Sequence, residues 1–321
     1  MENRISLDDK PPKINIRDYT IILLIVALFL FLTFSTDSFF SRNNLYSLIY
    51  GVSIQFFAII GFTLVLIAGE IDLTVGAMYG FSGTLVGALM AFGRLPFHLA
   101  VVAALTICTA IGFVIGALTV SLRLNSMMIT LASMTLVQGI NAVVFNRMSA
   151  AIYPASYRNF AKFQIGGVNW SIILMVIFII VLEILLIKTA AFKKIYYTGQ
   201  NNQTAKLYGI PVNKLKTLCF MASSFTAAFG GIIATSRITH SDIMTGRGLE
   251  FTIITACVIG GCSLSGGKGG ILKAAAGLIF LAMLSNGMII YRIEPFAQQV
   301  THGIILVLAV FIDARMNRKQ R

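Results

Sequence analysis

AGEIDLTVG, residues 68–76, places the carboxylates Glu70 and Asp72 between two long apolar runs. The run before it reads SLIYGVSIQFFAIIGFTLVLI, and the run after it reads AMYGFSGTLVGALMAF. Runs of this kind are typical of membrane-spanning helices. No lysine or arginine stands nearby in the sequence to pair with the acids, and Gly69 and Gly76 bracket them. The stretch therefore predicts a break between two helices, which we call the seam.

The composition indicates that most of the chain faces something other than water. The 321 residues are 57% hydrophobic and 12% charged, and the mean hydropathy is +0.85. Soluble domains carry about 25% charged residues. We therefore predict an all-α polytopic membrane protein of about ten transmembrane helices, some of them short or broken.

The hydrophobic segments and the charges between them predict the topology. Most lysines and arginines fall on one side if the amino terminus is cytoplasmic, so both termini are expected in the cytoplasm. We expect a cytoplasmic tail (1–18), one transmembrane domain (19–313) with a long internal loop (188–216), and a basic cytoplasmic tail (314–321). The segment 249–262 is short enough to be a re-entrant piece, but keeping it as an irregular span satisfies the charge rule. The ten predicted segments are 19–34, 45–68, 74–92, 96–120, 127–146, 169–188, 215–236, 249–262, 271–291 and 295–313.

Several functional classes lack their motifs in this sequence. The net charge of +13 is spread between apolar runs, where it sets membrane orientation, so no nucleic-acid partner is expected. The stretch GGCSLSGGKGG (residues 260–270) lacks the GxxxxGK[ST] spacing of a phosphate loop. The three histidines are far apart, and we expect no metal, no cofactor and no catalytic site. The four cysteines lack metal-site spacing and are expected to be buried free thiols: Cys108, Cys219, Cys257 and Cys262.

Glycines in two predicted helices recur at helical spacing. Four of them share one face of the segment 74–92, and two more repeat the spacing in the segment 96–120. Because glycine lets another backbone approach closely, tight helix packing is favoured over contact with a solute. The packing glycines are Gly76, Gly80, Gly83, Gly87, Gly112 and Gly116.

Four stretches, in order along the chain, resemble a known family of membrane permeases. AGEIDLTVGAMYGFSG (Ala68–Gly83) is similar to its signature, and YYTGQNNQTAKLYGIPVNKLK (Tyr196–Lys216) to its cytoplasmic loop. CVIGGCSLSGGKGG (Cys257–Gly270) and the closing stretch Leu284–Asp313 also follow its pattern. The chain thus resembles the permease subunits of ribose-type (monosaccharide) ABC importers. It departs from them at Thr74, Thr204 and Glu70, where serine, alanine and glycine are usual.

This resemblance implies a function and a set of partners. The chain would be a non-catalytic subunit of a bacterial inner-membrane importer for a ribose-like pentose or related monosaccharide. It would work with a second permease subunit, a separate ABC ATPase and an extracytoplasmic sugar-binding protein. A secondary carrier acting alone remains the alternative, although carboxylates inside the spans, the usual sign of ion coupling, are scarce outside the seam.

The resemblance also implies site residues. A short helix within Asn201–Gly209 would dock on the ATPase, and the seam would serve as a turn or gate. For Asp72 the residues favour a cap on the helix that starts near Thr74, and a moving hinge is the alternative. The coupling residues are Gly199, Asn201, Thr204, Ala205 and Gly209. The seam residues are Gly69, Glu70, Asp72, Thr74 and Gly76, and those of the glycine-rich loop are Gly260, Gly261, Ser263, Ser265, Gly266, Gly267 and Gly269.

Overall fold

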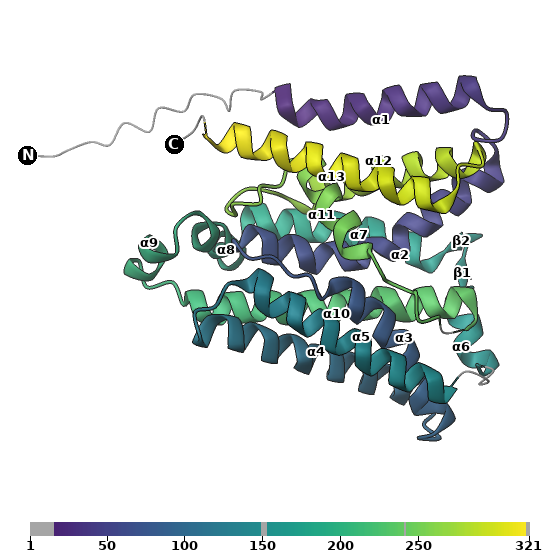
Figure 1. Ribbon diagram of the computed structural model, residues 1–321, viewed down its shortest axis with the longest axis horizontal. Helices are drawn as coiled ribbons and strands as arrows, with labels where there is room; N and C mark the ends of the chain where they lie inside the picture. The colour runs from purple at the N-terminus through teal and green to yellow at the C-terminus, as the bar shows by residue number, and fades with distance from the viewer. Residues whose placement is uncertain (1–15, 149–152, 241, 319–321) are drawn as a thin grey trace, which may run out of the picture.

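The computed structural model describes residues 16–148, 153–240 and 242–318 as a bundle of helices (Figure 1). Most of the predicted tail 1–18 and the last three residues of the tail 314–321 lie outside the described residues. Besides helices, the described part contains one antiparallel pair of two-residue strands, Gln164–Ile165 (β1) and Val168–Asn169 (β2). The helices are α1 (Ile16–Ser35), α2 (Arg42–Ile67), α3 (Val75–Ala91), α4 (Phe97–Ser121), α5 (Ser126–Met148), α6 (Ala155–Phe160), α7 (Trp170–Lys188), α8 (Ala190–Gln200), α9 (Asn202–Leu207), α10 (Val212–Ile238), α11 (Leu249–Ile259), α12 (Ile271–Ile290) and α13 (Pro295–Arg318).

The described helices have the length and composition of membrane spans. Seven of them, α2, α4, α5, α7, α10, α12 and α13, are long and apolar enough to cross a bilayer. Three shorter apolar helices accompany them, at Thr20–Ser35, Val75–Ala91 and Leu249–Ile259. The prediction of an all-α membrane protein is therefore confirmed.

Helix α10 lies at the centre of the bundle, packed on α2, α3 and α4. Small residues make the close approach of these helices possible. A Cβ atom added to Gly116 of α4 would lie 2.9 Å from the Cα of Thr217, and one added to Gly231 would lie 1.8 Å from the carbonyl oxygen of Tyr79. Backbones therefore meet here without intervening side chains, as small residues at helix interfaces allow.

The two ends of the bundle carry different short elements. Helices α8 and α9 lie at the end where α1 begins and α13 ends, whereas α6 and the hairpin lie at the opposite end (Figure 1). The carboxyl end of α10 is fixed to α6, since the Tyr157 hydroxyl donates to the Ile232 carbonyl at 3.2 Å and the Ala161 amide donates to Ser236 Oγ at 2.9 Å.

The region between α10 and α12 crosses the bundle without a full-length helix. Helix α11 has 11 residues, so it rises only about 16 Å, roughly half of the 30 Å hydrocarbon layer. The chain nevertheless leaves α10 beside α6 and reaches α8, where the Tyr196 hydroxyl donates to the Gly269 carbonyl at 2.9 Å. The predicted segment 249–262 is thus shorter as a helix than expected. It ends at Ile259 because the next glycines turn the chain, with Gly261 at φ +100°.

Candidate functional site

The seam joins the end of α2 to the start of α3 and is closed by Asp72. This carboxylate is buried, and its Oδ1 accepts hydrogen bonds from the Thr74 amide at 2.9 Å and from the Thr74 hydroxyl. Thr74 is the residue that precedes the first turn of α3. Asp72 therefore holds the entry to the helix, although it bonds the amide before the first turn rather than one inside it.

The other acid of the seam, Glu70, pairs with a lysine that is distant in sequence. Lys216 in the first turns of α10 donates to Glu70 Oε1, and the two side chains are only 8% and 16% exposed. Sequence reasoning missed this partner because 146 positions separate the two residues. Two features of the sequence could have indicated the pair. Lys216 stands at the edge of an apolar segment, and Glu70 stands where the resembled family usually has glycine.

Four glycines from three distant segments meet beside the start of the seam. We call Gly69, Gly199, Gly266 and Gly267 the glycine junction. The Gly267 amide donates to the Ile67 carbonyl at 2.9 Å. A Cβ atom on Gly199 would lie 1.9 Å from that same carbonyl oxygen, and one on Gly266 would lie 2.5 Å from the Cα of Gly69. The seam, the end of α8 and the 260–270 loop are thus in direct backbone contact.

Further bonds hold the 260–270 loop around this junction. The Ser263 amide donates to the Lys268 carbonyl at 3.0 Å, and the Ser265 amide donates to Ser263 Oγ at 3.2 Å. The Leu264 amide donates to Asp313 Oδ2 of α13 at 3.3 Å. Burial, together with the nearby Glu183 and Cys262, raises the pKa of Tyr196 to about 12, so its phenol stays protonated as the donor to Gly269.

Helix α9 occupies the middle of the predicted coupling segment. Asn201 begins it, with Oδ1 accepting from the amides of Gln203 and Thr204 at 2.9 and 3.0 Å. Gly209, at φ +73°, turns the chain after it. Ala205 faces the interior and is 3% exposed, whereas Leu207 and Tyr208 are 87% and 82% exposed. A partner would therefore meet Leu207 and Tyr208, which sequence reasoning did not single out, before it met Ala205.

The predicted packing glycines of α3 contact the chain around the start of α11. A Cβ atom on Gly80 would lie 2.1 Å from the Thr245 carbonyl oxygen, and one on Gly76 would lie 2.1 Å from Glu250 Oε2. Glu250 is 3% exposed, a buried carboxylate that sequence reasoning did not single out. The remaining four lie in the core: Gly83 against Thr235, Gly112 and Gly116 against α10, and Gly87 buried on α3.

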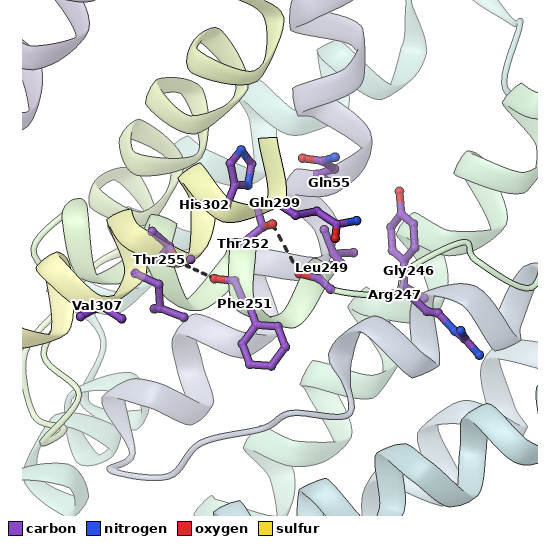
Figure 2. Close-up of a pocket in the computed structure, with 14 residues that line it drawn as sticks. Gln55, Gly246, Arg247, Leu249, Phe251, Thr252, Thr255, Gln299, His302 and Val307 are labelled. Carbon is purple, nitrogen blue, oxygen red and sulfur yellow. Dashed lines mark hydrogen bonds between the residues drawn. The ribbon is translucent and has the colours of Figure 1, made fainter. Parts of the chain in front are cut away.

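A groove opens on the side of the bundle between α2, α11 and α13, with a volume of about 820 Å³ (Figure 2). We call it the lateral groove. Thr252 and Thr255 of α11 donate to the carbonyls of Gly248 and Phe251 at 3.4 and 2.6 Å. His302 Nε2 lies 3.0 Å from Ser285 Oγ. The polar side chains that line the groove are Gln55, Tyr79, Arg247, Thr252, Thr255, Gln299 and His302.

Potential metal ligands do not cluster within residues 16–148, 153–240 and 242–318. No group of three or more histidine, cysteine or acidic side chains comes together in that part of the chain. The four cysteines are free and buried, which confirms the sequence expectation for them.

Comparison with known proteins connects these features to transport. Residues 44–311 match the family described as the permease component of the branched-chain amino acid transport system. The ribose import permease of Escherichia coli is 30% identical over 305 residues, covering 94% of both chains. The L-arabinose transport permease of the same organism is 30% identical over 308 residues, covering 94% of this chain and 92% of its own.

A third relative transports another kind of solute. The autoinducer 2 import permease of Escherichia coli is 30% identical over 306 residues, covering 94% of this chain and 88% of its own. No solved structure matches the chain. The family match covers the seam, the junction, α9 and the groove, and the relatives are matched nearly end to end. The chain therefore belongs to the family of permease components of these transport systems, and it is a multi-pass transmembrane subunit.

Proposed function

We propose that this permease component imports a small sugar, driven by a separate ATPase. The observation that carries the proposal is the glycine junction. It joins the seam within the bundle to α8, and α8 continues into α9, whose exposed tip lies outside the spans. A force applied to α9 would reach the break between α2 and α3 through backbone atoms, which yield less than flexible side chains do.

The topology in this proposal has ten spans and both termini in the cytoplasm. The seven long and three short apolar helices supply ten crossings, if the region from α10 to α12 counts as one. Helices α8 and α9 then lie on the cytoplasmic face of the bacterial inner membrane, beside the start of α1 and the end of α13 (Figure 1). The opposite end, with α6 and the hairpin, receives the sugar-binding protein.

The exposed side chains of α9 and α13 indicate where the partners bind. Leu207 and Tyr208 at the tip of α9 are the contact for the ATPase, and Lys193 and Lys194 of α8 line the same hollow as Tyr208. Lys206 on α9 and Lys214 on α10 are nearby in the sequence. The outward face of α13 is apolar and exposed, with Val300, Ile304 and Phe311 each more than half exposed. A second permease subunit, identical or homologous, covers that face.

A small sugar is the cargo that the relatives favour. The ribose and L-arabinose permeases are matched over more than nine tenths of this chain, and the names of both refer to pentoses. The autoinducer 2 permease is also 30% identical over 94% of this chain, and its cargo too is a small polar solute.

Reconstitution tests the energy source and the cargo together. Proteoliposomes that contain this chain, its ATPase and its binding protein should accumulate labelled D-ribose or L-arabinose when ATP is supplied. The same vesicles should not accumulate either sugar under a proton or sodium gradient without ATP. Accumulation driven by an ion gradient, with this chain as the only protein present, would establish the secondary carrier instead.

A further inference from the structure

Half of the residues that line the lateral groove carry polar side chains, although the groove lies between apolar helices. Gln55 lies near the middle of α2, half-buried, and Gln299 on α13 is exposed. A side-chain amide carries two N–H donors and an acceptor oxygen, which hydrocarbon cannot satisfy. Figure 2 shows Gln55, Gln299 and His302 on the same side of the groove, with Thr252 next to them. These side chains need water or a polar solute as their neighbour.

A second hollow in the same protein shows the contrast. A cavity of about 630 Å³ between α4 and α10 is lined by Val102, Leu105, Phe113, Met221 and Phe225, with two threonines. Thr106 and Thr109 donate to carbonyls four residues earlier at 2.8 and 2.7 Å, as the threonines of the lateral groove also do. The contrast therefore lies in the two glutamines and the histidine, which have no counterpart in this cavity. That hollow suits lipid chains, so polarity distinguishes the lateral groove from an ordinary gap between helices.

The chemistry of the lateral groove selects a class of solute. Its lining residues include no carboxylate, and the guanidinium of its one arginine, Arg247, lies within 3.5 Å of Met244 Sδ and points away from Gln299 and His302 (Figure 2). The other polar side chains of the lining are amides, hydroxyls and an imidazole, and they lie beside apolar ones (Leu249, Phe251, Leu306 and Val307). These polar groups donate and accept hydrogen bonds without net charge, as a molecule covered with hydroxyl groups requires. A zwitterionic amino acid would find no carboxylate for its ammonium group.

The groove lies beside a short, interrupted helix, where many membrane transporters bind their solutes. It adjoins the start of α11, a helix of 11 residues that begins inside the bundle after Gly248 at φ +78°. Solute sites of membrane transporters commonly lie near the membrane midplane, where discontinuous helices begin or end. A volume of about 820 Å³ is within the usual range of ligand pockets, roughly 300–1,000 Å³.

We propose that the cargo crosses the membrane along the lateral groove, and that it is a neutral polyhydroxylated molecule. It exchanges hydrogen bonds with Gln55, Thr252, Gln299 and His302. This inference rests on the proposed transport function, and it adds the path and the residues that select the solute.

Cysteine labelling tests the path whichever solute is carried. In the reconstituted complex, Thr252→Cys should react with a small water-soluble thiol reagent, at a rate that changes when ATP and binding protein are added. The matched control is Thr106→Cys, on the apolar cavity between α4 and α10, which should stay unreactive. The native cysteines add little background because all four are buried. A Thr252→Cys variant that is inert in every nucleotide state, or as slow as the control, would overturn the path.

Uptake tests the chemistry of the solute. Gln55→Leu and Gln299→Leu should each lower uptake of labelled D-ribose or L-arabinose about fivefold, the effect of one lost hydrogen bond. Thr106→Val should leave uptake unchanged. Normal uptake by both leucine variants would overturn the assignment of these residues. A wild-type complex that accumulates leucine but neither sugar would instead contradict the proposed function, and the labelling result would still decide whether the groove is the path.

Discussion

At the scale of single residues, the two acids of the seam have different roles. Asp72 is bonded locally, through Oδ1 to Thr74, whereas Glu70 reaches Lys216 on α10. A buried ion pair adds little net stability over a hydrophobic pair, but a buried charge that has lost its partner is costly. Glu70 and Lys216 therefore fix the position of the seam on α10 more than they stabilise the fold.

Removing one partner of this ion pair should be worse than removing both. Lys216→Met leaves Glu70 buried without a counter-charge and should lower the free energy of unfolding by about 3 kcal/mol. The double variant Glu70→Gln with Lys216→Met should recover most of that loss. The midpoint of thermal unfolding in detergent measures both. A double variant as unstable as the single one would show that the pair does not act as a unit.

At the scale of elements, the sequence predicted the helices better than the contacts between them. The break at the seam and the short segment after α10 follow from local signals, namely glycines and the length of apolar runs, whereas the helix within Asn201–Gly209 follows from the family resemblance. Long-range partners leave no such signal. The pairing of Glu70 with Lys216, the burial of Glu250 and the inward orientation of Ala205 depend on how the helices pack.

ATPase docking should be tested at the exposed residues of α9 and not at Ala205, which faces the interior. Since Ala205 is buried, Ala205→Glu would disturb this chain's own packing as well as any interface. Changing both Leu207 and Tyr208 to alanine should leave the fold intact, because both side chains are more than four fifths exposed. The variant should lose co-purification of the ATPase. Phe163→Ala, at the opposite end and also exposed, is the matched control and should retain it. Retention by both variants would place the docking site elsewhere.

At the scale of the whole molecule, the two ends of the bundle carry different elements, and the proposed topology assigns the end with α8 and α9 to the cytoplasm (Figure 1). The glycine junction lies near α8 and α9, and the lateral groove opens beside the middle of α2. The seam and the start of α11 lie between the two: the seam leads directly into α3, and the chain around the start of α11 contacts the packing face of α3. Motion of α9 therefore has a continuous route through backbone contacts to the elements that border the groove.

The proposed orientation can be tested on intact cells. Asn159→Cys on α6 and Gln203→Cys on α9 place exposed thiols at opposite ends of the bundle. An impermeant thiol reagent should label the first from outside, and should label the second only after the membrane is permeabilised, because α9 is cytoplasmic in this topology. Labelling of Gln203→Cys on sealed cells would invert the topology and remove the basis for ATPase docking at α9.

The central claim is that the glycine junction transmits ATPase motion to the membrane domain. Its most direct test is to measure ATP hydrolysis and solute uptake in the same proteoliposomes for Gly199→Ala. The added methyl group would lie 1.9 Å from the Ile67 carbonyl oxygen, so the junction must open, while the exposed tip of α9 is left unchanged. Gly139→Ala is the control, because a Cβ atom at that position meets nothing within 4 Å.

We expect hydrolysis to continue in Gly199→Ala while uptake falls about tenfold, within the 5–150-fold range typical of lost coupling between sites. Gly139→Ala should match the wild type in both measurements. Uptake at the wild-type rate by a folded Gly199→Ala subunit, with hydrolysis unchanged, would contradict the account.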